Sequence, residues 1–290
     1  MSSPKTSTKT AKPGPVSLMP TRRDLRFRLP AERISDWNDD SVHVSQFMNT
    51  LSIVFPVGER FFIQSVRNYR DRITDPELQK AVTAFIGQEA MHGREHEEYN
   101  EALFAKVPQA AEFEQRVARL LGFVQKRLPK STQLSATIAL EHFTAILADA
   151  LLKEPRVLEK AHPRFAALWR WHALEETEHK AVAYDVWDAV MGRGARAYVG
   201  RTSGLLAATA IFWVMIAPAY LQILRAEGKL TDVRGWRLWA RHTLGEVGIL
   251  RRIVLPWADY FRPDFHPWDH DNRHFLEEID TLTAELQAAA

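Results

Sequence analysis

The chain of 290 residues contains no cysteine. Disulfide bonds, zinc–thiolate sites, iron–sulfur clusters and thiol nucleophiles are therefore excluded. The 11 histidines and 36 acidic residues remain as side chains that could bind a metal. Any metal in this protein must be held by imidazole and carboxylate groups.

The chain also lacks a large excess of charge of either sign. Its 38 basic and 36 acidic residues give a net charge of +2. This balance, together with the absence of an RNA- or DNA-binding motif, indicates that nucleic acid is not a partner. Hydrophobic residues make up 46% of the chain, which is enough for the core of one large domain or two small ones.

The N-terminal stretch lacks an apolar run. It reads MSSPKTSTKTAKPGPVS, and this composition predicts a disordered tail, which we place at residues 1–24. Without an apolar run the tail is no secretory signal, so we expect a cytoplasmic protein, with peripheral membrane association as an alternative. Residues 25–290 are predicted to form a single helical domain, with a metal-binding bundle at about 41–192 and a C-terminal helical extension at about 196–290.

Glycine and proline are sparse between residues 40 and 260, and no segment shows the alternating pattern of a strand. The apolar positions instead recur with helical spacing, which predicts an all-α fold. The predicted helices span about 41–70, 76–105, 109–127, 132–153, 163–191 and 196–225, with amphipathic segments near 235–252 and 272–288.

Local signals mark several helix ends. Asp75 is placed to cap a helix whose first residue is Pro76, and Ser131 is placed to cap a later one. Pro163 lies near the first turn of another helix, and Gly192 is placed to end it.

Two of the predicted helices carry the same acidic and imidazole pair. QEAMHGREH contains Glu89 and His92, and EETEHK contains Glu176 and His179. Groups three residues apart lie on one face of a helix, so each pair can point at one spot. Two Glu-x-x-His pairs on separate helices form half of a di-metal carboxylate site, and the other half requires one Glu on each of two partner helices.

Both partner residues are present on the remaining long helices. Glu59 lies in FPVGERFF and Glu141 lies in the apolar run TIALEHFTAIL. The order is therefore Glu, Glu-x-x-His, Glu, Glu-x-x-His. The gap of 52 residues between Glu89 and Glu141 leaves room for the long crossover of such bundles, with a connecting helix inside it.

This donor set suits two divalent cations. Four carboxylates offset the charge of the cations, and imidazole with carboxylate is the set that iron or manganese prefers. Burying the carboxylates without cations would be costly, so the metal is expected to be part of the folded state. A single Glu-x-x-His pair is typical of a solvated helix face, but the ordered set on four helices favours a metal site.

The order of these motifs resembles that of the ferritin-like di-iron carboxylate bundles. The stretches FPVGERFF, TDPELQKAVTAFIGQEAMHGREHEEYN and FRPDFHPW also resemble a bacterial family of predicted metal-dependent hydrolases, over roughly residues 25–275. The resemblance implies a ferritin-like four-helix bundle with a crossover helix and additional C-terminal helices. It also implies a centre of two iron ions, with manganese or a mixed iron–manganese pair as alternatives.

A further histidine precedes the second pair. His172, Glu176 and His179 form the pattern His-x3-Glu-x2-His on one helix face. This resembles the pattern of the di-iron arylamine N-oxygenases, which makes His172 a candidate seventh ligand. The alternative is a core or ligand-supporting histidine, and His96, one turn beyond His92, is favoured in such a supporting role.

Three neighbouring residues compete with or flank the chosen ligands. Glu175 is four residues before His179 and is the one competitor to Glu176, but we assign it to a supporting or solvated role, as we do Glu178. His142 directly follows Glu141 and so faces about 100° away on the helix, where a structural role is expected.

Residues 204–224 form a run of 21 residues without charge. This length reaches the threshold for a membrane span, although Pro218 would kink the helix. The favoured interpretation is a buried fifth helix or one that lines an apolar substrate pocket; membrane contact and a homodimer interface are the alternatives.

The C-terminal region contains five residues that could form a second metal cluster. Their Pro-rich and Asp-rich setting favours a capped loop that leads into the last helix. These residues are His266, Asp269, His270, Asp271 and His274.

The sequence thus predicts a di-metal carboxylate enzyme. The first hypothesis is an oxygen-dependent oxidase or oxygenase that acts on an apolar or aromatic small molecule and needs an electron donor. The alternative is a metal-dependent hydrolase that uses a metal-bound hydroxide as nucleophile. A further alternative is a non-enzymatic iron-binding protein.

Overall fold

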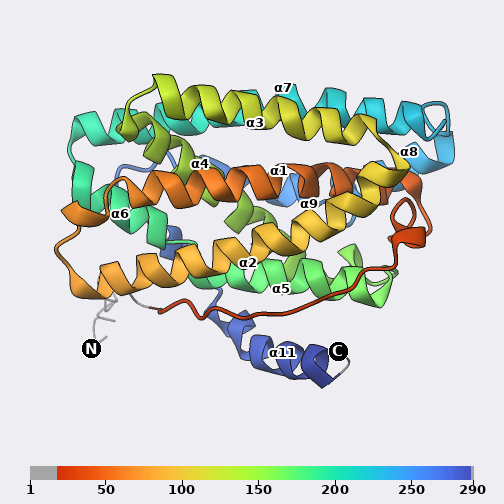
Figure 1. Ribbon diagram of the computed structural model, residues 1–290, viewed down its shortest axis with the longest axis horizontal. Helices are drawn as coiled ribbons and strands as arrows, with labels where there is room; N and C mark the ends of the chain where they lie inside the picture. Colours follow the sequence, from red (N-terminus) through yellow and green to blue (C-terminus); the bar gives the residue numbers. More distant parts are fainter. Residues whose placement is uncertain (1–17, 289–290) are drawn as a thin grey trace, which may run out of the picture.

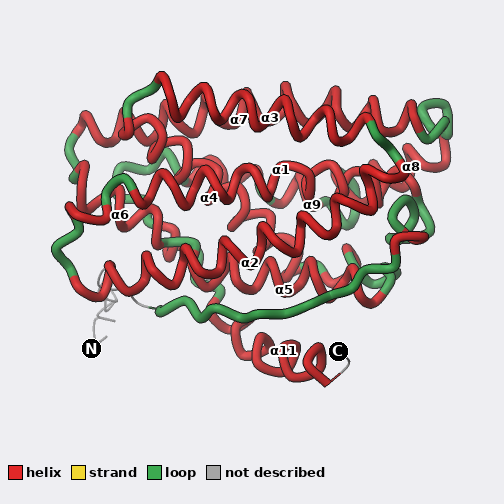
Figure 2. The backbone as a smooth tube through the Cα atoms, viewed as in Figure 1, coloured by secondary structure: helices red, strands yellow, loops and turns green. Residues whose placement is uncertain are grey.

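The computed structural model describes residues 18–288, and within this range the regular structure is entirely helical (Figures 1 and 2). The only strand-like feature there is an isolated bridge between Asn38 and Ala161. The predicted all-α class is therefore confirmed. The helices are α1 (Val42–Arg67), α2 (Pro76–Lys106), α3 (Gln109–Arg127), α4 (Lys130–Lys153), α5 (Pro163–His179), α6 (Val182–Met191), α7 (Ala195–Ala226), α8 (Val233–Thr243), α9 (Ile249–Arg252), α10 (Val254–Asp259) and α11 (Ile279–Ala288).

The long helices are arranged in three layers of two (Figure 1). Helices α1 and α4 form the middle layer, and each packs on one helix of the layer below, α1 on α2 and α4 on α5. The connecting helix α3 lies over α1, and α7 lies over α4 beside α3. The middle and lower layers together form a four-helix bundle with short hairpins within each pair and α3 in the crossover between the pairs.

Helix ends follow the predicted signals with one exception. The side chain of Asp75 accepts hydrogen bonds from the backbone N–H groups of Glu77 and Leu78, and Pro76 is the first residue of α2. Ser131 was predicted to cap α4, and this is wrong, because the helix begins one residue earlier, after Pro129. The backbone carbonyl of Pro129 accepts from the N–H groups of the next turn and makes a side-chain cap unnecessary.

The helix predicted at 163–191 is divided into α5 and α6 at Lys180 and Ala181. At this point the buried Lys180 ammonium group donates to the backbone carbonyl of His270 (2.6 Å) and to Oδ1 of Asn272 (2.7 Å). The segment predicted at 235–252 is likewise divided into α8 and α9. Gly248 has φ +60° there, a left-handed conformation that glycine adopts at little cost.

Pro56 lies inside α1 and has no N–H, so the carbonyl of Ser52 loses its partner within the helix. Nδ2 of Asn100 on α2 donates to this carbonyl at 3.0 Å, and the Ser52 hydroxyl donates to Oδ1 of the same Asn100 at 2.8 Å. The helix pair α1–α2 is thus joined by polar contacts at the level where the bundle carries its buried histidines.

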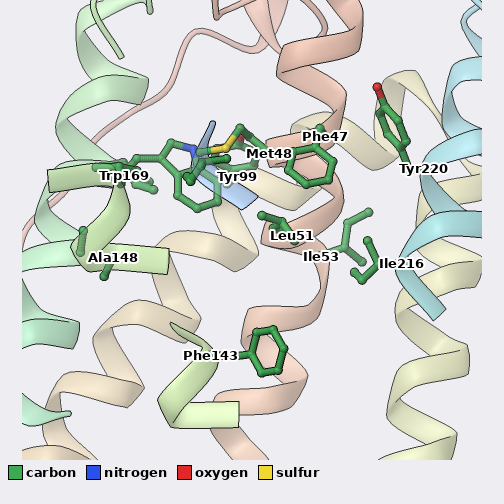
Figure 3. Close-up of a cluster of buried hydrophobic side chains, with 14 of the residues drawn as sticks. Phe47, Met48, Leu51, Ile53, Tyr99, Phe143, Ala148, Trp169, Ile216 and Tyr220 are labelled. Carbon is green, nitrogen blue, oxygen red and sulfur yellow. The ribbon is translucent and has the colours of Figure 1, made fainter. Parts of the chain in front are cut away.

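Helix α7 contains the uncharged run 204–224. Helices α4 and α7 are long and apolar enough to cross a membrane, judged by length and composition alone; 72% of the most apolar window of α4 is buried and 22% of that of α7. One face of α7 packs on the bundle, where the ring of Tyr220 lies 5.7 Å from that of Phe47 and Ile216 lies on the same side (Figure 3). The opposite face exposes Val199, Leu206, Val214 and Leu221. A fully buried fifth helix is therefore wrong, whereas the alternative of a helix that lines an apolar pocket is confirmed.

The close contact between α4 and α7 depends on Gly204. A Cβ atom at this position would lie 2.0 Å from Oγ of Ser135 and 3.1 Å from its backbone oxygen. We expect Gly204→Ala to lower the free energy of unfolding by about 1–3 kcal/mol, because the helices must move apart. The matched control is Gly122→Ala in α3, where no atom lies within 4 Å of the new Cβ. It should raise stability by about 0.5–1 kcal/mol. Urea unfolding of both variants measures the difference; equal effects would contradict the close packing.

Candidate metal centre

Seven acidic and imidazole side chains meet in the interior of the four-helix bundle. They are the seven predicted ligands, and each is buried. They form three overlapping groups, in each of which one donor atom per residue lies within 4.8 Å of the others. The groups are Glu59–His92–His172, Glu89–His92–Glu176 and Glu89–Glu141–His179. The first comes from α1, α2 and α5, the second from α2 and α5, and the third from α2, α4 and α5.

Glu176 lies at the centre of the cluster. Its Oε1 is 3.1 Å from Nε2 of His172 and 3.8 Å from Nδ1 of His92. Its Oε2 is 3.6 Å from Nε2 of His179. The same nitrogen of His179 lies 3.0 Å from Oε1 of Glu89 and 3.7 Å from Oε2 of Glu141. Donor atoms from three helices therefore face one small region.

Many of these donor atoms have no hydrogen-bond partner. Both carboxylate oxygens of Glu59, Glu89 and Glu141 are buried and unpartnered. The ring nitrogens of His92, His172 and His179 that face the cluster also have no hydrogen-bond partner. The short contact between His179 and Glu89 lacks hydrogen-bond geometry. Buried polar atoms without partners are costly, and a cluster of them is a strong indication of an ion that fits between them. Glutamate oxygens and imidazole nitrogens are the donors expected for divalent iron, manganese or zinc.

The pKa values of the clustered carboxylates also favour bound cations. Burial, together with the charges of neighbouring carboxylates, holds the pKa values of Glu59 and Glu141 well above their ordinary value. Burial also raises the pKa of Glu176, but the nearby imidazoles of His179 and His172 outweigh it and place this pKa well below the ordinary value. Four ionised carboxylates cannot share this volume without added positive charge. Divalent cations would supply that charge.

The two histidines of the Glu-x-x-His pairs are each oriented through the ring nitrogen that faces away from the cluster. Nδ1 of His179 lies 3.0 Å from Oε1 of Gln88. This amide oxygen can only accept, so Nδ1 carries the proton and Nε2 presents its lone pair to the cluster. Nε2 of His92 lies 3.1 Å from Oε2 of Glu175, which leaves Nδ1 directed inward. Such partners fix the ring orientation that metal binding requires.

Glu175 is turned away from the cluster and contacts the outer nitrogen of His92. Nη1 of Arg23 lies 3.2 Å from its Oε1 and 3.0 Å from Oε2 of Glu178. Burial raises the pKa of Glu175 to about 8, and Arg23 opposes part of that rise. Gln88 in turn donates to Glu178 and to the backbone carbonyl of Thr21 (3.0 Å), which fixes the orientation of its amide.

These contacts correct the predicted extent of the tail. Residues 1–17 lie outside the described residues, but Thr21 and Arg23 make ordered contacts with α2 and α5. The N–H of Thr21 donates to Oε2 of Glu178 at 2.9 Å. The segment 18–30 runs in extended form along the lower layer (Figure 1). It covers the side of the cluster that α2 and α5 form.

His96 extends the cluster toward α1 without joining the donor groups. Its Nε2 lies 2.9 Å from Nδ1 of His172, and its Nδ1 lies 2.8 Å from Oγ of Ser52. Asn100 holds Ser52 in place, because it bonds both the hydroxyl of Ser52 and the carbonyl that the proline in α1 leaves free. The proline therefore contributes indirectly to the orientation of His96 and His172. Nε2 of His172 is thereby directed at Glu176, which is consistent with either predicted role of His172.

Aromatic rings enclose the cluster. The ring of Phe85 lies 5.0 Å from that of His179, Trp171 lies 4.8 Å from His92, and Phe55 lies 4.6 Å from His172. These three rings keep water from the donor atoms and lower the local dielectric. The hydroxyl of Thr144 donates to Oε2 of Glu176 at 2.6 Å and faces the cluster from α4, as Glu141 does.

Four residues around the cluster escaped the sequence analysis. Gln88 stands four residues before His92 on the same helix face, a spacing that could have revealed it. Gly93 is a costly residue inside a helix, and here it makes room, since a Cβ would lie 3.2 Å from Oε2 of Glu59. Arg23 lies in the arginine-rich stretch TRRDLRFR and Thr144 in an apolar helix, and neither gives a local signal.

The remaining histidines have structural contacts. Nε2 of His142 lies 3.1 Å from the carbonyl of Pro256, away from the cluster. His266 and Asp269 form a capping box at the 3-10 helix Pro267–Asp269, as the capped-loop prediction required. Among residues 18–288, the C-terminal acidic and histidine residues do not join a group with metal-binding spacing.

Removal of the carboxylate behind His92 should weaken metal binding. We expect Glu175→Ala to lower the affinity for divalent metal about 10–100-fold, because Nε2 of His92 loses its hydrogen-bond partner and the ring loses its fixed orientation. Glu101→Ala on the exposed side of the same α2 helix as His92 is the control and should change nothing. Competition with a fluorescent chelator gives both affinities. Equal affinities for the two variants would exclude the supporting role.

The comparisons with known proteins agree with a metal site. A family model described as predicted metal-dependent hydrolase matches residues 21–271. No curated protein and no solved structure matches the chain. The matched range begins at the segment that carries Arg23 and includes each of the seven clustered residues.

Proposed function

The chain belongs to the family of predicted metal-dependent hydrolases, and from this premise we propose that it is an enzyme with a centre of two divalent metal ions. The three overlapping donor groups carry the proposal, because their unpartnered oxygens and nitrogens need cations. We assign the ligands to the seven clustered residues. The pairing of α1 with α2 and of α4 with α5 supports the ferritin-like arrangement inferred from the motif order.

We propose hydrolysis as the reaction. Bound divalent cations would act as Lewis acids that polarise a carbonyl or phosphoryl oxygen and make water a better nucleophile. The protein supplies the geometry: Gln88 and Glu175 hold the rings of His179 and His92 in place, and Thr144 holds one oxygen of Glu176. The rings of Phe55, Phe85 and Trp171 exclude bulk water, so that interactions inside the site are strong.

A second function is favoured by the donor set itself. The cluster contains glutamate and histidine but no aspartate, it is fully buried, and an apolar cavity adjoins it. This combination supports oxygen-dependent oxidation of an apolar molecule at two iron or manganese ions, with electrons from a separate donor. Storage of iron is less well supported, because the cavity that adjoins the cluster is mostly apolar and would not favour the passage of ions.

One set of measurements tests both functions. The purified protein is loaded with Zn²⁺, Mn²⁺ or, without oxygen, Fe²⁺, and its metal content is counted by elemental analysis. Two metals per chain and metal-dependent release of p-nitrophenol from acyl esters would support hydrolysis. Oxygen uptake by the reduced iron form, without ester cleavage, would favour oxidation. Fewer than one bound metal per chain under all three conditions would exclude the proposal.

A further inference from the structure

An apolar cavity of about 660 Å³ lies between α1, α3, α4 and α7. Its wall comes mainly from helices of the upper and middle layers, whereas the donor groups come from helices of the middle and lower layers; Figure 1 shows these layers. Leu51 of α1, Phe143 of α4 and Ile216 of α7 belong to its wall and appear in Figure 3. The size is that of a site for a small molecule, and most of the wall is aliphatic or aromatic.

Polar side chains occur mainly at the outer end of this cavity and near its inner end. Ser131, Thr132, Arg196 and Ser203 line its outer end, near the starts of α4 and α7. Thr144 lies near the inner end, three residues before Leu147 on α4. From Ser131 to Leu147 the wall follows α4 for sixteen residues, which corresponds to about 24 Å of helix. The cavity is therefore long and mostly apolar, with polar groups at its outer end and at Thr144.

The inner end of the cavity reaches the donor cluster. The Thr144 hydroxyl lines the cavity and donates to Oε2 of Glu176. Gly58 and Leu140 also line it, and each directly precedes a clustered carboxylate, Glu59 or Glu141. Both oxygens of each of these two carboxylates lack hydrogen-bond partners.

The opposite side of the cluster is closed. There the partners of the histidines, Gln88 and Glu175, are held by Thr21 and Arg23 of the N-terminal segment. Ion pairs and hydrogen bonds fill this side, so a substrate would have to break them to enter. The cavity side requires no such loss, which makes it the route of access.

We propose that this cavity binds a linear aliphatic chain, that of a long-chain fatty-acid ester, with the ester group at Thr144. This rests on the proposed function, since the cluster must be the reactive centre. A long apolar wall stabilises methylene groups by removing them from water. A compact polar molecule would leave its hydrogen bonds unmade along the same wall.

The test measures binding of cis-parinaric acid, a fluorescent C18 fatty acid, to the full-length protein. Ala208 lines the cavity, so Ala208→Trp fills it. Ala210 on the same helix is exposed, two residues or about 200° around α7, so Ala210→Trp is the matched control. Metal content is counted for the wild type and both variants.

We expect parinaric acid to bind the wild type and Ala210→Trp equally, and Ala208→Trp about tenfold or more weakly. Equal binding by both variants, or no binding by the wild type, would overturn the inference. If circular dichroism shows that Ala208→Trp is unfolded, Ser203→Trp at the exposed outer end replaces it, with the same two outcomes. Fatty-acid binding by a wild type that holds no metal would instead refute the proposed function and leave the cavity as a lipid site.

Discussion

Removal of metal is expected to lower the melting temperature of the protein by roughly 7–10 °C. Two sites filled at about 100 times their dissociation constants contribute about 5 kcal/mol, and each kcal/mol corresponds to about 1.5–2 °C for a chain of this size. The loss is large because the same cations compensate the buried carboxylates. Differential scanning calorimetry before and after chelation measures it.

A matched variant separates this effect from a general effect of the chelator. Glu59→Gln keeps the shape of the side chain but removes one buried carboxylate whose pKa burial holds well above its ordinary value. In the metal-free protein we expect this variant to be more stable than the wild type by about 1–3 kcal/mol, because folding of the wild type must either bury the Glu59 charge or add a proton to it, and glutamine requires neither. In the metal-loaded protein it should be less stable. A side chain with only a packing role would shift both forms in the same direction, and that result would argue against Glu59 as a ligand.

Replacement of Glu141 by alanine is expected to reduce the metal content from two ions per chain to one or none. Glu141 is the residue that α4 contributes to the donor groups, and both of its oxygens lack other partners. Without Glu141, only Glu89 and His179 remain in this donor group, and a site with two ligands binds metal weakly. Elemental analysis after gel filtration gives the stoichiometry.

Two further variants define the outcome. Glu141→Asp keeps a carboxylate on a shorter side chain and should retain more metal than Glu141→Ala. Glu101→Ala, on the exposed side of α2, should keep the wild-type content. Two ions per chain in Glu141→Ala would exclude this residue as a ligand.

Much of the fold follows from the sequence because its signals are local. The helical spacing of apolar residues and caps such as Asp75 depend on neighbours within one or two turns, and the corresponding helices begin and end near the predicted residues. The same holds for the spacing of Glu89 with His92 and of Glu176 with His179. A shared helix face is a property of the helix alone, so these pairs could be found before the helices were placed.

The interruption of the predicted helix 163–191 shows where such reasoning ends. The ammonium group of Lys180 meets His270 and Asn272, which follow it by ninety residues or more, and no local pattern announces that contact. The ligand-supporting contact of Arg23 with Glu175 is of the same kind, since it joins residues 152 apart in the chain.

By itself, the sequence determined an all-α chain with four acidic and two or three imidazole groups placed on inward helix faces. Only the tertiary structure decided which ring nitrogen of each histidine faces the cluster, how the N-terminal segment covers it, and that a long apolar cavity reaches it past Thr144. The physical reason is that these features depend on the distances between helices. Packing over the whole chain sets those distances, and no single stretch of residues contains them.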